Sequence, residues 1–236
     1  MFFSSKEAFL KKIPLFENIS ERDVQLIARD LKQRPYKEGD LIFHEGDPGE
    51  SLFIVRSGKV RIYVGGNRSG VETSVILFGR PGEVFGELAV VDGEPRSASA
   101  RAIENTVVYF VDRDTFRDHM LKIPQLAMNF TQLLTKRMRY NTSQLNSMAS
   151  LTVTSRLARQ LIKLSNDYGR EEGEGIVIDI NLTQTDLASL IGATRESTNR
   201  AMRSLRKANV ADMIQGKLLV YNLAELQEIA TASDSK

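Results

Sequence analysis

Apolar side chains between residues 124 and 150 recur at the spacing of one long amphipathic helix. Steps of 4, 3, 4 and 3 residues separate Leu134, Met138, Asn141, Leu145 and Met148. This is the heptad repeat of a coiled-coil seam, and so narrow a stripe on so long a helix favours pairing with a second copy over packing on a globular core. We therefore predict a helix over residues 124–150 and a homodimer whose interface contains these five positions.

One position of this seam is polar. Asn141, with Thr142 directly after it, places two small hydrogen-bonding groups near the expected two-fold axis. A polar side chain in a dimer seam lowers stability, and it either fixes the register of the two helices or serves a ligand. The pattern alone leaves both interpretations open.

Before this helix the periodicity changes twice. Residues 4–34 have a helical pattern that is split at Pro14, and Ser20 is placed to cap the second helix. From residue 34 to 112, short apolar runs alternate with glycine-containing turns, with residues 67–70 at one hairpin tip and 102–112 as the closing strand. Such a series predicts an antiparallel sandwich or barrel of the jelly-roll type. A further helix is expected over residues 113–121.

The chain after the long helix is expected to be mainly helical. Residues 151–154 are a short polar interruption and the natural hinge, and residues 155–165 form a basic amphipathic helix. We expect residues 169–175 to be a solvated loop and 176–182 a strand. The predicted fold class is α+β, with a barrel domain (1–123), a dimerisation helix (124–150), a hinge (151–154) and a winged helix-turn-helix domain (155–236).

Residues 182–210 have the layout of a helix-turn-helix. Thr183 is placed to cap the first helix, Gly192 permits the tight turn and Thr194 caps the second helix. Residues 213–221 then predict a hairpin that turns at Gly216, which is a wing.

The second of these helices carries residue types that read DNA bases. Arg195 can donate two hydrogen bonds to guanine, and Glu196 can accept one from cytosine. Between residues 193 and 217 there are six basic and two acidic residues, a net charge of +4, which suits phosphate. The candidate DNA-binding residues are Thr183, Thr194, Arg195, Glu196, Ser197, Asn199, Arg200, Arg203 and Lys217.

The composition removes several classes of function. The 236 residues have room for one large or two ordinary domains, and there is no cysteine, which excludes disulfides, thiolate nucleophiles and iron-sulfur clusters. Two histidines, His44 and His119, are too few for a histidine-rich metal site. No apolar run of membrane-spanning length and no secretory signal pattern is present. We expect a cytoplasmic protein with no membrane association, no metal and no catalytic residues.

The segment from 82 to 102 contains a compact candidate site for an anion and a sugar. Its members are Gly86, Glu87, Leu88, Arg96, Ser97 and Ala98. The Arg96 guanidinium suits phosphate, with the Ser97 hydroxyl as a further donor. An ionised Glu87 accepts hydrogen bonds only, so it suits a ribose hydroxyl. An ion pair between Glu87 and Arg96 on a surface loop is the simpler alternative.

The segment from 82 to 102 is similar to one that is found in a known family. Gly86-Glu87-Leu88 with Arg96-Ser97-Ala98 resembles the cassette of cyclic-nucleotide-binding barrels, and the whole chain resembles the CRP/FNR superfamily of bacterial transcription regulators. The resemblance implies that Arg96 and Ser97 hold a cyclic phosphate, that Glu87 holds the ribose 2'-hydroxyl, and that Asn141 and Thr142 contact the purine, one subunit contributing each. The implied ligand is cAMP.

The same resemblance extends to DNA. Arg195-Glu196-Ser197 followed by Arg200 is similar to the recognition helix of the family, which implies a palindromic operator with TGTGA-like half-sites and contact with RNA polymerase. The function expected is a cAMP-responsive homodimeric transcription regulator. The alternatives are the same scaffold without a ligand, the same scaffold with another effector such as cyclic di-GMP, and, more distantly, a cupin-like metalloenzyme.

Overall fold

The computed structural model describes residues 5–65, 72–173, 175–180, 182–214 and 216–231. The expected hairpin tip at residues 67–70 therefore lies outside the described residues. The chain divides into two compact units, Met1–Met138 and Arg139–Lys236. The elements in chain order are α1(Ser5–Leu10), η1(Pro14–Phe16), α2(Glu21–Asp30), β1(Lys32–Tyr36), β2(Leu41–Phe43), β3(Ser51–Ser57), β4(Val60–Gly65), β5(Glu72–Gly79), β6(Val84–Phe85), α3(Glu87–Asp92), β7(Ser99–Ala102), β8(Thr106–Asp112), α4(Arg113–Lys122), α5(Pro124–Ser150), α6(Val153–Tyr168), β9(Gly169–Glu172), β10(Gly175–Ile178), α7(Gln184–Leu190), α8(Arg195–Lys207), β11(Ala211–Ile214), β12(Lys217–Val220) and α9(Leu223–Thr231).

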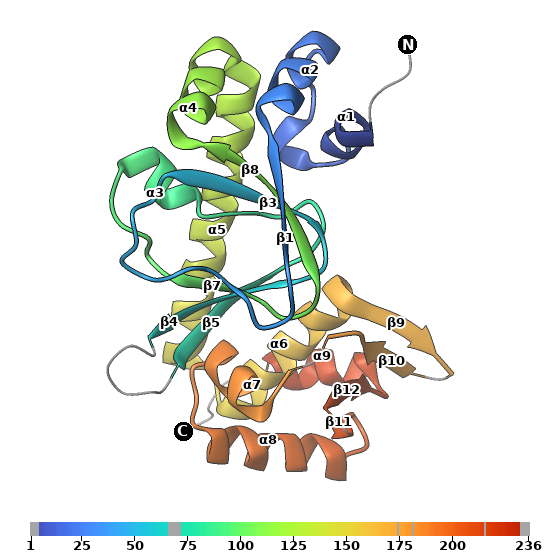
Figure 1. Cartoon of the computed structure of the whole chain (residues 1–236). Helices are drawn as coiled ribbons and strands as arrows, with labels where there is room; N and C mark the ends of the chain where they lie inside the picture. Colours follow the sequence, from blue (N-terminus) through green and yellow to red (C-terminus); the bar gives the residue numbers. More distant parts are fainter. Residues whose placement is uncertain (1–4, 66–71, 174, 181, 215, 232–236) are drawn as a thin grey trace. The chain divides into compact units, whose positions relative to one another are not determined.

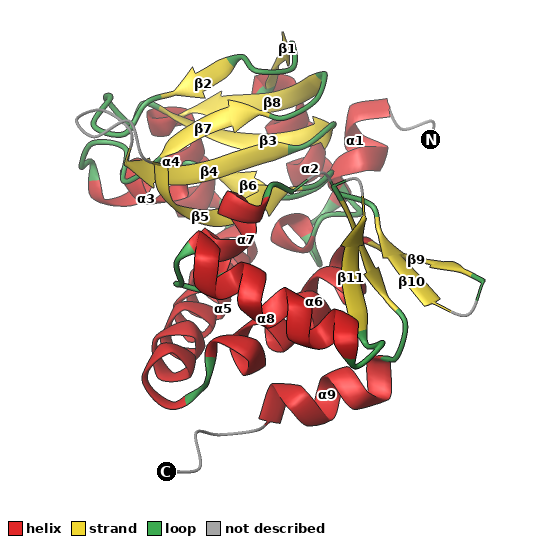
Figure 2. Cartoon of the chain, turned by 90° about the horizontal axis from the view of Figure 1, so that it is seen from below, coloured by secondary structure: helices red, strands yellow, loops and turns green. Residues whose placement is uncertain are grey.

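The first unit is built on two antiparallel sheets with strand orders β1-β8-β3-β6 and β2-β7-β4-β5 (Figure 2). One apolar cluster draws side chains from both sheets and contains Phe43, Phe53, Val60, Phe85 and Ala100. The two sheets therefore enclose a core, as expected for the predicted jelly-roll type of barrel.

A second cluster lies on the other side of the first sheet. Leu52 and Ile54 of β3 belong to it together with Phe116 of α4 and Leu126 of α5, and helices α1, α2 and α4 gather near this sheet (Figure 1). Because Phe53 faces the first cluster, β3 is buried on both faces. This explains why the strand is a continuous apolar run with no alternation.

Two strand boundaries in this unit differ from the prediction. The helical pattern predicted over residues 4–34 extends too far toward the C-terminus. Strand β1 begins at Lys32 and pairs with β8 in the register Lys32↔Phe110. Its Pro35 is tolerated because β1 is an edge strand. The closing strand over residues 102–112 is also interrupted, since β7 ends at Ala102 and β8 begins at Thr106.

The second unit contains a sheet of order β11-β12-β10-β9 and helices α6 to α9. Residues 169–175 were expected to be a loop, and that was wrong: β9 pairs with β10 in the register Val177↔Arg170. The interruption after the long helix is also shorter than residues 151–154. Helix α6 begins at Val153, and the Thr152 hydroxyl caps it by accepting from the Ser155 amide.

Several local predictions are confirmed. Helix α5 spans Pro124–Ser150. The side chains of Ser20, Thr183 and Thr194 each accept a hydrogen bond from the amide three residues on, as helix N-caps do. Gly216 adopts a positive φ between β11 and β12, as the wing turn requires.

The last turns of α5 pack against the turn between α7 and α8. Gln144 Nε2 donates to the Leu190 carbonyl at 3.3 Å. At Gly192 (φ +60°), an added Cβ would lie 2.4 Å from Cε of Met148. Arg156 Nη1 donates to the Leu151 carbonyl at 3.1 Å, and its Nη2 donates to the Gly192 carbonyl at 3.4 Å. Residues 144–148 of the long helix are therefore held on the helix-turn-helix.

Gly192→Ala is expected to destabilise the protein by two separable effects. A side chain at this φ costs roughly 1–2 kcal/mol, and displacing Met148 adds about 1 kcal/mol. Gly216→Ala is the matched control, because its φ is +80° and nothing lies within 4 Å of the added Cβ. Urea unfolding of both variants, with and without Met148→Ala, measures the difference. Equal losses in the free energy of unfolding for Gly192→Ala and Gly216→Ala, both with Met148 present, would show that Met148 does not fill the space beside Gly192.

Candidate nucleotide site and DNA-reading surface

The centre of the predicted cassette is the guanidinium of Arg96, whose residue is only 5% exposed. Nη1 donates to the carbonyl of Gly86 and Nη2 to the carbonyl of Ser51, both at 2.8 Å. The Arg96 backbone is fixed as well, because its amide donates to Asp47 O at 2.9 Å and its carbonyl accepts from Gly46 N at 2.8 Å. Two loops far apart in the sequence are thus joined around one cation.

One edge of this guanidinium is unused. Nε of Arg96 is buried and has no hydrogen-bond partner among the described residues. Burial lowers the pKa of Arg96 from its ordinary value, and the carboxylates of Glu87, Asp47 and Glu50 act in the opposite direction. Because arginine starts from so high a pKa, the group stays charged at neutral pH. A buried cation with a free N–H is suited to an anion.

Gly86 is required by the same arrangement. It precedes α3 with φ +73°, and a Cβ at this residue would lie 2.5 Å from Nη1 of Arg96. Glycine therefore serves both the left-handed backbone and the close approach of the guanidinium. Helix α3 begins directly after it, at Glu87.

Glu87 is buried at the start of α3 and forms an ion pair with α5. Its Oε1 lies 2.6 Å from Nη1 of Arg137, which also donates to the carbonyl of Val84 through Nη2. The alternative of a surface ion pair between Glu87 and Arg96 is not what the structure shows, since Arg137 is the partner of Glu87. Sequence reasoning missed Arg137. It precedes Asn141 by one helical turn, and that spacing is the signal that could have found it.

A second carboxylate faces Arg137. Burial raises the pKa of Glu83 above its ordinary value, against the opposing effects of Arg80 and Arg137. Arg80 Nε donates to Glu83 Oε1 at 3.2 Å, while Oε2 is buried without a partner among the described residues. Arg137 thus lies in the field of two acidic groups on the barrel unit.

The remaining cassette residues differ in exposure. Ser97 and Leu88 are exposed, whereas Ala98 is buried. Asn141 and Thr142 are exposed on the part of α5 that belongs to the second unit. Within the first unit the structure therefore brings together Gly86, Glu87 and Arg96, and adds Arg137.

The predicted dimer seam is uncovered at its centre. Met138 is 64% exposed and Leu145 is 67% exposed. At its ends the seam contacts its own chain, since Leu134 packs partly on the first-unit core and Met148 lies against Gly192. Exposed apolar side chains that share one face of a helix are the kind of surface that marks interaction sites.

Helix α8 separates its faces cleanly. Thr198, Ala201, Met202 and Leu205 are buried against the rest of the unit. The opposite face is solvent-exposed and carries Arg195, Glu196, Arg200 and Arg203, with Ser197 and Asn199 half-buried and Lys217 exposed on the wing. The hydroxyl of Thr183 accepts from Asp186 N at 3.1 Å and donates to Asp186 Oδ2 at 2.7 Å, so it is occupied in capping α7.

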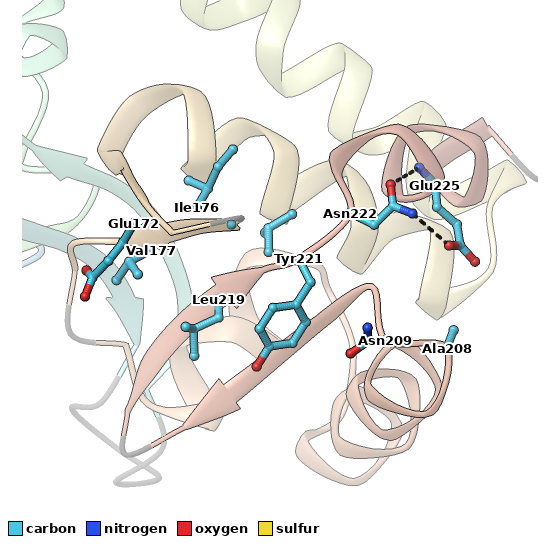
Figure 3. Close-up of a pocket in the computed structure, with 11 residues that line it drawn as sticks. Glu172, Ile176, Val177, Ala208, Asn209, Leu219, Tyr221, Asn222 and Glu225 are labelled. Carbon is cyan, nitrogen blue, oxygen red and sulfur yellow. Dashed lines mark hydrogen bonds between the residues drawn. The ribbon is translucent and has the colours of Figure 1, made fainter.

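A pocket of about 580 Å³ lies elsewhere in the second unit, between β10, β12 and the start of α9 (Figure 3). Two of its polar residues are bonded to each other: Asn222 Oδ1 accepts from the Glu225 amide and its Nδ2 donates to Glu225 Oε2, both at 3.1 Å. None of the predicted site residues lines it. Among the described residues there is no cluster of three or more metal-ligating side chains. No helix in the described part of the chain has both the length and the apolar character needed to span a bilayer.

Comparison with known proteins matches both units. Residues 33–122 match the cyclic nucleotide-binding domain family, and residues 155–229 match the Crp-like helix-turn-helix domain family. The chain is 33% identical to the cyclic AMP receptor protein of Thermus thermophilus over 94% of this chain and 98% of that protein. It is 31% identical to a CRP-like cAMP-activated global transcriptional regulator of Mycobacterium tuberculosis, covering 83% of this chain and 87% of that one.

A solved structure agrees with these relatives. The crystal structure of the Thermus thermophilus catabolite activator protein matches with a TM-score of 0.53 and 31% identity, over 92% of this chain and 98% of that one. The cyclic-nucleotide cassette, the capped helix-turn-helix and these matches lead to one conclusion. The chain belongs to the CRP/FNR family of transcription regulators, with a cyclic nucleotide-binding domain and a DNA-binding helix-turn-helix, and it is not an enzyme.

Proposed function

We propose that this protein is a homodimeric, sequence-specific transcription regulator whose affinity for DNA is controlled by cAMP. The observation that carries the proposal is the buried, charged Arg96 with a free Nε–H, beside a Glu87 that is tied to the long helix through Arg137. An anion at Arg96 and a hydroxyl donor at Glu87 describe a cyclic ribose phosphate.

Each group of such a ligand has a counterpart in the chain. The phosphate would accept from Arg96 and the exposed Ser97 hydroxyl, and the ribose 2'-hydroxyl would donate to Glu87. Backbone groups around Gly86 and Leu88 and the small Ala98 complete the cassette, while Asn141 and Thr142, one from each subunit, contact the purine. The names of two relatives that are more than 30% identical support cAMP as that ligand.

The dimer is supported by the exposed seam. Burying the Met138 and Leu145 side chains against a second copy would stabilise the dimer by about 25 cal/mol for each Å² of apolar surface removed from water. Leu134 and Met148 extend the same seam on either side, and Asn141 lies between Met138 and Leu145. This arrangement places Asn141 and Thr142 of both copies near the two-fold axis, where each ligand can meet both subunits.

The contacts of α5 suggest how ligand and DNA are coupled. Asn141 lies one turn after Arg137, which is paired with the barrel, and just before Gln144, which donates to the Leu190 carbonyl beside the helix-turn-helix turn. A ligand that favours one arrangement of the paired helices would then favour one spacing of the two α8 helices. The ligand can shift the equilibrium between the two arrangements only by the difference in its binding free energy for them.

On DNA, α8 would enter the major groove of a palindromic operator with TGTGA-like half-sites. Its exposed N-terminal residues Arg195 and Glu196 would meet base edges, and Arg203 and Lys217 would meet phosphates. The remaining DNA-facing positions are Thr183, Thr194, Ser197, Asn199 and Arg200. RNA polymerase is the expected protein partner, and the site of action is the cytoplasm, where chromosomal DNA lies.

The ligand is tested by calorimetric titration of the dimer with cAMP, cGMP and cyclic di-GMP. We expect cAMP to bind, and Arg96→Ala to lower its affinity by about 100-fold, since charged hydrogen bonds of about 1.5–3 kcal/mol are lost. Arg22→Ala, an exposed arginine on α2, is the control and should bind as the parent does. Binding that survives Arg96→Ala would place the ligand elsewhere. Absence of binding to all three nucleotides would reject nucleotide control and leave the DNA-reading function standing.

The DNA surface is tested by fluorescence anisotropy with operator and scrambled duplexes over a range of salt concentrations. Arg195→Ala should cost about 1–3 kcal/mol on the operator and relax its preference over the scrambled duplex. Lys217→Ala should weaken both duplexes alike and reduce the salt slope by about 1. If Arg195→Ala weakened both duplexes equally, base reading by this residue would be rejected.

A further inference from the structure

We infer that Phe43 is a positioning residue for the ligand phosphate, because its ring supports the guanidinium plane of Arg96. This inference rests on the proposed nucleotide function. Cζ of Arg96 lies 4.3 Å from the centroid of the Phe43 ring and 5.5 Å from that of Phe53. Both distances are within the range of a cation–π interaction, which strengthens when the cation is removed from water, as Arg96 is.

Phe43 is itself held in a fixed orientation. It is 9% exposed at the end of β2, and its ring packs against Phe53 at 5.6 Å and against Phe85 at 6.0 Å between centroids. Phe53 and Phe85 stack on each other at 5.1 Å. The surface beneath the guanidinium is therefore a rigid aromatic cluster and not a single mobile ring.

The geometry of the two hydrogen bonds shows why a support is needed. Nη1 is bound to Gly86 O and Nη2 to Ser51 O, and these two points define an axis through the guanidinium. Hydrogen bonds at both ends of an axis do not stop the plane from tilting about it. Nε lies off this axis, so tilting would swing its unpaired N–H away from a bound phosphate. The Phe43 ring, whose centroid lies 4.3 Å from Cζ, resists that tilt.

Simple core packing is the competing explanation, since Phe43 belongs to the apolar cluster between the sheets. Fluorination separates the two explanations. Fluorine atoms withdraw electron density from the ring and weaken its attraction for a cation, while the shape of the ring is nearly kept. The effect of fluorine on ring–ring contacts alone is measured by the control at Phe116, whereas the support of Arg96 would weaken further with each added fluorine.

The experiment replaces Phe43 in the full-length protein with 4-fluoro-, 3,5-difluoro- and 3,4,5-trifluoro-phenylalanine and measures cAMP affinity by calorimetry. We expect affinity to fall stepwise, reaching about a 3- to 10-fold loss for the trifluoro variant, with the melting temperature kept. The same series at Phe116 is the matched control. Phe116 is 1% exposed and contacts the ring of Phe130 at 5.4 Å, and it faces no cation among the described residues.

A flat series at Phe43, a series equal to that at Phe116, or a gain in affinity with fluorination would each overturn the inference. A gain would mean that Arg96 must leave the ring to bind phosphate.

A second measurement keeps this result separate from the proposed function. In the ligand-free protein the Nε–H resonance of Arg96, assigned with Arg96→Lys, should show a ring-current shift that falls in Phe43→Leu to the smaller contribution of the more distant Phe53 ring. No shift would refute the support. A shift in a protein that binds none of the nucleotides would confirm the contact, reject the phosphate role and reject nucleotide control as well.

Discussion

The burial of one positive charge organises the barrel unit. Moving a guanidinium out of water is costly unless hydrogen-bond acceptors and negative charge replace the lost hydration. Arg96 meets this requirement with two backbone carbonyls, an aromatic face and the field of Glu87, Asp47 and Glu50. Each acceptor lies in a different segment, so the start of β3 at Ser51 and the backbone of Gly86 before α3 are held in place by the same side chain.

The long helix connects this site to the rest of the chain. At Arg137 it is bound to Glu87 and to the Val84 carbonyl of the barrel unit. At Gln144 and Met148 it is bound to the turn between α7 and α8. Gln144 follows Arg137 by two helical turns, and the polar pair Asn141 and Thr142 lies between them. A perturbation at that pair acts on the short segment between two anchored points.

The features that the sequence predicted well are those with a short-range cause. The heptad spacing located α5 at both ends, and the N-caps at Ser20, Thr183 and Thr194 follow from side chains that bond an amide three residues away. The glycine turns indicated the barrel for the same reason. Strand β9 was missed because its polar residues 169–172 become a strand only by pairing with β10.

The site was predictable in part for a similar reason. Gly86, Glu87 and Arg96 lie within one segment, and their chemistry could be read from their types. The acceptor at Ser51 is 45 residues from Arg96 in sequence, and Arg137 is 50 residues beyond Glu87, a separation that no local pattern spans. Nothing in the sequence distinguishes Phe43 from an ordinary apolar strand residue, because a ring that supports a cation has the same sequence signal as one that fills a core.

The ion pair between Glu87 and Arg137 also bears on whether ligand binding must break a contact of the protein. A carboxylate has two oxygens with about four acceptor positions, and Arg137 Nη1 is placed on Oε1 of Glu87. Acceptor capacity therefore remains for a ribose hydroxyl while the ion pair to α5 persists. Arg96 also keeps hydrogen-bonding capacity. Its two terminal nitrogens donate to Gly86 O and Ser51 O, and its Nε has no partner among the described residues. A cyclic nucleotide that uses the vacant positions would add its contacts to those already present, so its binding would tighten the link between the cassette and the long helix.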